Sequence, residues 1–105
     1  MERNRLQITD TTDVVMKTEL LADKFTSFGW HVVEIDGHDI TQLKTSLGLP
    51  PFHKDKPTAV LVNTIKGSGI STMENAITWH HKVLTNEEYN LAVNEIETKI
   101  QLMGA

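Results

Sequence analysis

The chain has 105 residues, with 10 Lys or Arg and 14 Asp or Glu, which gives a formal net charge of -4 when histidine is neutral. This length suits one domain with a small core, and the acidic balance excludes a protein held to nucleic acid or an anionic membrane by its overall charge. The absence of cysteine excludes disulfides and thiolate catalysis. No apolar run reaches about 18 residues and no leader-like segment opens the chain, so we expect a cytoplasmic protein without a membrane span.

The first third of the chain predicts a loop followed by a helix. Residues 1–17 mix polar, β-branched and turn-forming types without a steady period, which favours a loop with a turn of helix near residues 13–16. Thr18 can cap a helix that Gly29 ends. Its apolar residues recur at helical spacing and are Leu20, Leu21, Phe25 and Phe28.

The middle of the chain predicts a strand, a helix and a second strand. Residues 30–35 alternate in polarity and are rich in β-branched types, which is typical of a strand. Asp39 is a suitable N-cap for a helix that Gly48 ends. Residues 58–65 are almost continuously apolar, which favours a strand buried on both faces and parallel to the first.

A long loop and a last helix complete the predicted fold. Residues 66–84 form the loop, and connections of that length inside a domain are often functional. Thr85 caps the helix, whose apolar stripe includes Tyr89, Ile96 and Ile100. We therefore predict an α/β fold, α-β-α-β-α, with two parallel strands joined by a right-handed crossover. Because two strands make a poor sheet, we expect self-association or strands supplied by another chain.

Lys66 is a candidate ligand-binding residue because it follows the buried strand directly. It stands where that strand opens into Gly67-Ser68-Gly69, at the carboxyl end of a parallel sheet, where open α/β folds place their ligands. Glycines let the backbone approach an anion, and an ammonium group neutralises it. Local sequence alone favours the alternative, a solvated lysine on a glycine turn.

The histidines offer weaker signals. His80 and His81 are adjacent, so we expect their side chains to point apart, and one imidazole could donate to a phosphate or exchange a proton. A surface or packing role is the more common alternative. Asp36, His38 and Asp39 could suggest a metal site, but strand-to-helix punctuation explains them more simply.

Taken together, several motifs of this sequence resemble the transketolase family, and most closely the separately encoded amino-terminal subunits of some microbes. They are Asn4-Arg5-Leu6, Gly29-Trp30, Asp36-Gly37-His38-Asp39, Lys66-Gly67-Ser68-Gly69, Met73-Glu74-Asn75 and Trp79-His80-His81. They follow the family's order over essentially the whole chain. The resemblance implies that residues 1–105 are one domain, a part of the thiamine-diphosphate-binding domain, with a loop at 1–17 and an α/β unit at 18–105.

The resemblance also implies roles for particular residues. Asn4 would offer its side-chain oxygen and Leu6 its backbone carbonyl to the magnesium ion that bridges the cofactor's diphosphate, and hard oxygen ligands suit that ion. Lys66 and His80 would lie beside the diphosphate and the substrate entrance, with His80 as the catalytic candidate. His81 departs from the glycine that is common in the family.

The family transfers two-carbon ketol units between sugar phosphates with thiamine diphosphate and magnesium. Its metal and diphosphate motif begins before Asn4, so we expect this chain alone to be inactive and to bind the cofactor poorly. The alternatives are a subunit that completes a split transketolase and a non-enzymatic module that self-associates or binds a phosphorylated metabolite. The expected partners are a second copy of the chain or complementary transketolase segments, with sugar phosphates only in a complete enzyme, and neither nucleic acid nor a membrane.

Overall fold

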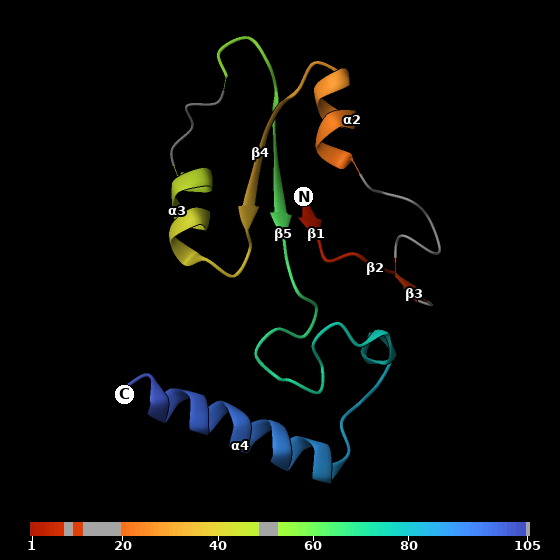
Figure 1. The fold of residues 1–105 in the computed structure, drawn as a ribbon, viewed down its shortest axis with the longest axis vertical. Coiled ribbons are helices and arrows are strands. Elements are labelled where there is room, and N and C mark those ends of the chain that lie inside the picture. Colours follow the sequence, from red (N-terminus) through yellow and green to blue (C-terminus); the bar gives the residue numbers. More distant parts are fainter. Residues whose placement is uncertain (8–9, 12–19, 49–52, 105) are drawn as a thin grey trace.

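The structure is a computed structural model that describes residues 1–7, 10–11, 20–48 and 53–104. Figure 1 shows a small sheet with two helices beside it and a third helix set apart. The elements in chain order are β1 (Glu2–Arg3), β2 (Leu6–Gln7), β3 (Asp10–Thr11), α2 (Leu21–Ser27), β4 (His31–Asp36), α3 (Ile40–Gly48), β5 (Thr58–Asn63), the 3₁₀ helix η1 (Ile77–His80) and α4 (Asn86–Leu102). The predicted α/β class is confirmed.

The main sheet has the order β1-β5-β4, and both pairings are parallel. The predicted parallel pair is therefore present, and β1 adds a third strand on the other edge of β5. The Val62 N–H donates to the Met1 carbonyl at 2.8 Å and the Thr64 N–H donates to the Arg3 carbonyl at 3.0 Å. Strand β1 has only two residues, which is too short to produce an alternating pattern in the sequence.

The predicted loop over residues 1–17 contains more pairing than expected. Besides β1, it holds an antiparallel pair of two-residue strands, in which Leu6 lies opposite Thr11 and Gln7 opposite Asp10. The turn of helix predicted near residues 13–16 lies outside the described residues. The prediction that Thr18 caps the first helix is wrong, because the helix α2 begins at Leu21 with Leu20 as its N-cap residue and without a side-chain cap hydrogen bond.

Two helix starts follow the capping chemistry read from the sequence. The Asp39 carboxylate accepts hydrogen bonds from the N–H groups of Thr41 at 2.8 Å and Gln42 at 3.1 Å. Together with the Gln42 side chain, these donors hold the pKa of Asp39 below its ordinary value. At α4, the Glu88 N–H donates to Thr85 Oγ1 while the Thr85 N–H donates to the Glu88 carboxylate, which is a capping box.

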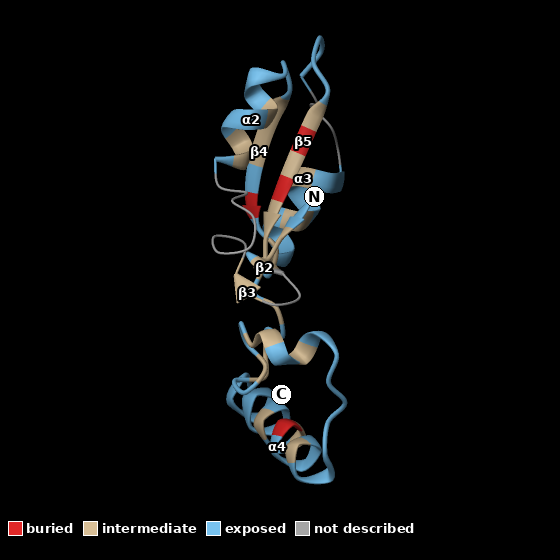
Figure 2. Cartoon of the chain, turned by 90° about the vertical axis from the view of Figure 1, so that its right-hand side faces the viewer, coloured by how far each residue is buried: buried red, intermediate tan, exposed pale blue. Residues whose placement is uncertain are grey.

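Helices α2 and α3 both pack on β4 and lie on opposite sides of the sheet in Figure 2. Gly29 ends the first of them with a φ of 85°, a left-handed value that glycine adopts without strain. The Phe25 and Trp30 rings then meet edge to face, with centroids 5.4 Å apart, and connect α2 to the start of β4. These ends agree with the sequence prediction.

The turn after β4 depends on the small size of Gly37. Its N–H donates to the Asn63 carbonyl at 2.7 Å, which brings the turn against the end of β5. A Cβ at this position would lie 2.5 Å from Thr64 Cγ2 and 2.6 Å from Val62 Cγ1. The end of β4 therefore approaches β5 more closely than any side chain at position 37 would allow.

The core of the described residues is small. Its buried hydrophobic residues are Ile35, Ala59, Leu61 and Ala92, and of these Leu61 is fully buried. In β5, Ala59 and Leu61 point to one face of the sheet and are buried, whereas Val60 and Val62 point to the other face and are only half-buried. The prediction of a strand buried on both faces is therefore wrong for this chain, because one face of β5 is only partly covered.

The whole chain exposes more surface than a compact protein of its mass. Its accessible surface is 7876 Å², against about 5,900 Å² for a compact monomer of this mass. Its radius of gyration is 17.3 Å, against about 13 Å for a compact domain of similar length. Figures 1 and 2 show the reason, since α4 lies beyond the loop that follows β5 and covers neither face of the sheet. None of the described helices is long and apolar enough to cross a membrane.

The close packing at Gly37 leads to a stability prediction. Replacing Gly37 with Ala should lower the free energy of unfolding by about 1–3 kcal/mol, because the added Cβ overlaps two side chains of the β5 segment. Urea unfolding followed by circular dichroism measures this change. Gly48→Ala is the matched control, since a Cβ there meets no atom of the described residues within 4 Å, and it should be neutral or slightly stabilising. Equal effects at the two positions would contradict the prediction.

Candidate functional site

A pocket of about 630 Å³ lies at the carboxyl ends of the three parallel strands. The parallel arrangement brings together residues that are distant in the sequence, because β1, β4 and β5 all end at the same edge of the sheet. The residues lining the pocket are Arg3, Asn4, Arg5, Leu6, Thr11, Asp36, His38, Asn63, Thr64, Ile65, Ser68 and Asn75. Its position is the one that open α/β sheets use for ligands.

The lining favours an anionic ligand. The lining residues include two basic residues, Arg3 and Arg5, and one acidic residue, Asp36. Most of the remaining lining side chains are amides and hydroxyls, which can donate to phosphate oxygens. Arg5 has a φ of 60°, so the backbone takes a left-handed turn between β1 and β2 and stays at the pocket edge.

His38 is a structural part of this pocket. Its side-chain Nε2 accepts a hydrogen bond from the Ile65 N–H at 2.8 Å. The backbone N–H of His38 donates to Asp36 Oδ1 at 2.9 Å. The imidazole therefore connects the turn after β4 to the segment after β5. Within the described ranges, no group of three or more acidic or histidine side chains could hold a metal ion. These contacts support the structural interpretation of Asp36, His38 and Asp39.

The structure brings Asn4 and Leu6, the predicted metal ligands, to the same pocket. The Leu6 N–H donates to the Asn4 side-chain oxygen at 3.0 Å, which fixes the orientation of that amide. An amide oxygen and a backbone carbonyl are ligands of the kind that magnesium accepts. They fit part of a magnesium shell, and both are neutral, so the rest of the shell and its negative charge must come from other groups.

Lys66 lies in a loop that begins at the pocket but is not itself part of the lining. The neighbouring Ile65 and Ser68 line the pocket, and Lys66 is half-buried. Its carbonyl accepts a hydrogen bond from the Asn75 N–H at 3.0 Å, which closes the loop over residues 66–75. A Cβ at Gly67 would lie 2.5 Å from the Met73 carbonyl oxygen, so this closed loop requires glycine there.

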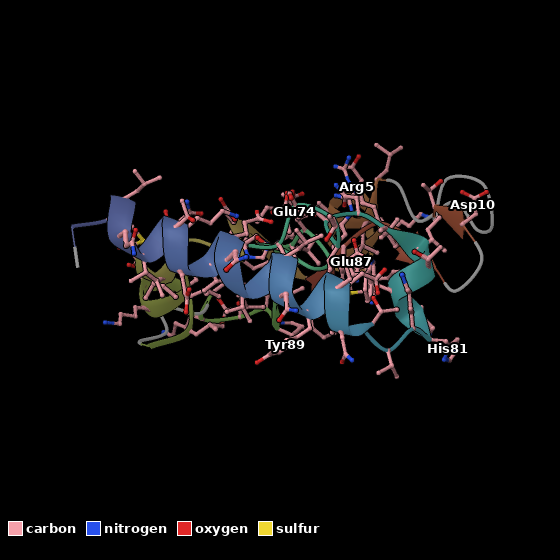
Figure 3. The ribbon with its side chains drawn as sticks, turned by 90° about the horizontal axis from the view of Figure 1, so that it is seen from below. Arg5, Asp10, Glu74, His81, Glu87 and Tyr89 are labelled. Atoms are coloured by element: carbon pink, nitrogen blue, oxygen red, sulfur yellow. The ribbon has the colours of Figure 1, made fainter. Side chains whose placement is uncertain are left out.

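His80 lies outside the pocket, at the end of η1, and is exposed. The rings of His80 and His81 meet edge to face with centroids 4.5 Å apart, so the expectation that they point apart is wrong. The cause is local, because the chain leaves the 3₁₀ turn at His81. In Figure 3, His81 and Arg5 lie on opposite sides of the view.

The segment before His80 is fixed through Trp79. The indole Nε1 donates to the Thr72 carbonyl at 3.0 Å, and the Lys82 ammonium lies 4.4 Å from the centre of the indole ring. Lys82 also pairs with Glu88, and that contact, with the Thr85 donors, holds the pKa of Glu88 below its ordinary value. The position of η1 is therefore tied to both the preceding loop and α4.

Several lining residues carry only weak signals in the sequence. Asn63 and Thr64 fall inside the strand predicted over residues 58–65. The change from apolar to polar residues at Asn63 could have indicated that the strand ends there and that these two side chains lie at its carboxyl end. Arg5 stood in the Asn4-Arg5-Leu6 motif without a role of its own, and no pattern singled out Arg3. Asn75 was part of a motif, but nothing in the sequence alone indicated that it would return to the beginning of its own loop.

Comparison with known proteins gives a consistent result. Residues 1–99 match the family described as transketolase, thiamine diphosphate binding domain. The chain is 39% identical to an apulose-4-phosphate transketolase subunit of Phocaeicola vulgatus over 96% of its own length and 36% of that protein. It is 38% identical to a 6-deoxy-6-sulfo-D-fructose transketolase subunit of Clostridium sp. (90% and 34%). It is 31% identical to human transketolase (96% and 16%). The chain thus spans about a third or less of these relatives.

The His38 contact yields a prediction about the pocket. His38→Ala should speed amide hydrogen exchange at Ile65 and lower the free energy of unfolding by about 0.5–1.5 kcal/mol, because the Ile65 N–H loses its acceptor. Nuclear magnetic resonance follows the exchange. His53→Ala is the control, since His53 is exposed in a loop and contacts the His31 ring. Unchanged exchange at Ile65 in His38→Ala would show that this hydrogen bond does not fix the segment.

Proposed function

The chain belongs to the transketolase family, as a segment of its thiamine-diphosphate-binding domain, and from this we propose that its pocket takes the diphosphate and magnesium of that cofactor. The observation that carries the proposal is the position and charge of the pocket. It lies at the carboxyl ends of three parallel strands and is lined by Arg3 and Arg5. A diphosphate is a compact anion that such a lining would favour.

Four residues have proposed roles at this site. The Asn4 side-chain oxygen and the Leu6 carbonyl would ligate magnesium, and their shared turn at the pocket supports this. Lys66 would neutralise the diphosphate from the adjoining loop. His80 would lie at the substrate entrance and position a sugar or exchange a proton. Its exposed place on η1, outside the lining, suits an entrance better than the diphosphate site.

We infer that the reaction served by this site is transfer of a two-carbon ketol unit between sugar phosphates, in a complete enzyme. When bound, thiamine diphosphate supplies the carbon nucleophile for that chemistry. The relatives named above are transketolases or transketolase subunits. Residues 1–105 alone would be inactive, because the described residues offer magnesium two neutral ligands and no acidic cluster.

The surface supports a partner. Roughly 2,000 Å² of surface beyond that of a compact protein is comparable to what one side of a large obligate interface buries. Part of it is an apolar seam on α4 with spacings of four, three and four residues, formed by Tyr89, Val93, Ile96 and Ile100. That spacing favours packing against another helix. The candidates are a second copy of the chain and complementary transketolase segments, as in a split enzyme.

A non-enzymatic module is the second candidate function. It would use the same scaffold to self-associate or to bind a phosphorylated metabolite. A stable oligomer that binds inorganic phosphate but not thiamine diphosphate would favour it. The arginine-lined pocket alone is compatible with both functions.

The first functional prediction concerns the cofactor. Thiamine diphosphate with millimolar magnesium should bind the 105-residue chain weakly or not at all, because an ion held by two neutral protein ligands keeps its waters. Isothermal titration calorimetry makes the measurement. An affinity in the micromolar range or tighter would refute the prediction and show that the described residues suffice for binding.

The second functional prediction needs a complex that regains ketol transfer after complementary transketolase segments are added. Lys66→Ala should weaken cofactor retention by about 1.5–3 kcal/mol, because a charge-assisted contact to the diphosphate is lost. His80→Ala should instead reduce turnover by ~10²-fold or more with a smaller change in cofactor affinity. Steady-state kinetics with cofactor titration separates the two effects.

His81→Ala is the control for the histidine. It should have a mild effect, because His80 occupies the family's position in the motif. The two rings are in contact, so His81→Ala also tests whether that contact is needed to orient His80. A larger loss of turnover in His81→Ala than in His80→Ala would mean that the motif is aligned one residue out of register.

A further inference from the structure

Two side chains of α4 hold the backbone of the loop that follows β5. Both oxygens of the Glu95 carboxylate lie 3.1 Å from the donating Ser71 N–H, and the Ser71 hydroxyl donates to Oε2 at 2.9 Å. The Lys99 ammonium donates to the Gly69 carbonyl at 2.6 Å and to Glu95 Oε1 at 2.7 Å. The pair therefore binds the loop at two points, as an acceptor at Ser71 and as a donor at Gly69.

The loop between these points is also held from within. The Gly69 N–H donates to the Glu74 carboxylate at 3.0 Å. The Asn75 N–H closes the loop onto the Lys66 carbonyl. Gly69 itself has a φ of 103°, a conformation that needs outside contacts to persist because glycine has many others available.

The loop held by α4 leads directly to the pocket. The residues that α4 contacts, Gly69 and Ser71, lie between Ser68 and Asn75 in the sequence. Both Ser68 and Asn75 line the pocket. Helix α4 lies against this loop and apart from the sheet in Figures 1 and 2. The contacts of Glu95 and Lys99 are thus a route by which α4 can affect the pocket.

We propose that Glu95 and Lys99 are positioning residues, which fix the 66–75 loop so that Ser68 and Asn75 face the ligand of the pocket. The identity of that ligand rests on the proposed function, whereas the positioning of the loop does not. The contacts from Lys99 and Ser71 also hold the pKa of Glu95 below its ordinary value, so the carboxylate stays an acceptor at neutral pH.

A simpler alternative is that Glu95 and Lys99 only stabilise α4 as an ion pair one turn apart. Exchanging the two residues separates these explanations. In the double variant Glu95→Lys with Lys99→Glu the ion pair remains, but lysine cannot accept from the Ser71 N–H and glutamate cannot donate to the Gly69 carbonyl. Glu97→Gln is the control, because it changes a charge on the same helix at an exposed position.

The first readout is amide hydrogen exchange by nuclear magnetic resonance, with circular dichroism as the check that α4 stays helical. In the exchanged variant, the Ser71 amide should exchange about tenfold faster or more, because a hydrogen bond to a charged acceptor is lost, and the amide signals of Ser68 and Asn75 should shift. Glu97→Gln should leave all three amides unchanged. Exchange at Ser71 that stays the same in the exchanged variant would overturn the proposal.

The second readout is titration with magnesium pyrophosphate, followed through the Ser68 and Asn75 amide signals. We expect the exchanged variant to bind magnesium pyrophosphate about tenfold more weakly than Glu97→Gln does. A tenfold loss of affinity is the effect expected when one charged or polar contact to the ligand is misplaced. Equal binding despite faster exchange at Ser71 would overturn the proposal, because the loop would then not matter to the pocket. If millimolar pyrophosphate moves no pocket signal in the unmodified chain, that result agrees with the weak cofactor binding expected of this chain, and the exchange at Ser71 alone supports or overturns the proposal.

Discussion

The parallel pairing of β5 with β1 on one side and β4 on the other determines where the pocket lies. It brings three strand ends to one edge of the sheet. Asn4 after β1, His38 after β4 and Ile65 after β5 reach a common pocket only because these ends coincide. The hydrogen bond between His38 and the Ile65 N–H and the close approach at Gly37 then fix the segments to one another.

The same pairing leaves much of the chain uncovered. Strand β5 has neighbours on both edges, but Val60 and Val62 stay half-buried and α4 covers neither face of the sheet. Small domains gain little stability from so few buried side chains. The proposed magnesium ligands in the pocket, Asn4 and Leu6, would both be neutral. The exposed surface and the proposed site therefore both favour our proposal that this segment of a transketolase domain works with further polypeptide.

The sequence predicted the regular elements well because their signals are local. Asp39 and Thr85 as caps, and Gly29 and Gly48 as helix ends, were read from short-range chemistry, and the structure has them. What could not be predicted depends on distant contacts. The two-residue strand β1 forms only because it pairs with β5. The ring contact of His80 with His81 depends on how the chain leaves η1. The hydrogen bonds between α4 and the 66–75 loop join residues that are 24 and 30 positions apart in the sequence.

The dependence on further polypeptide is tested most directly by the association state of the 105-residue chain. Sedimentation velocity over concentrations from about 1 to about 100 μM would show whether exposed apolar surface drives mass-action assembly. The account predicts a sedimentation coefficient that rises with concentration toward a dimer or larger species. A single compact species with the 11.8 kDa mass of the monomer at every concentration would contradict it, because the chain would then cover its apolar surface by itself.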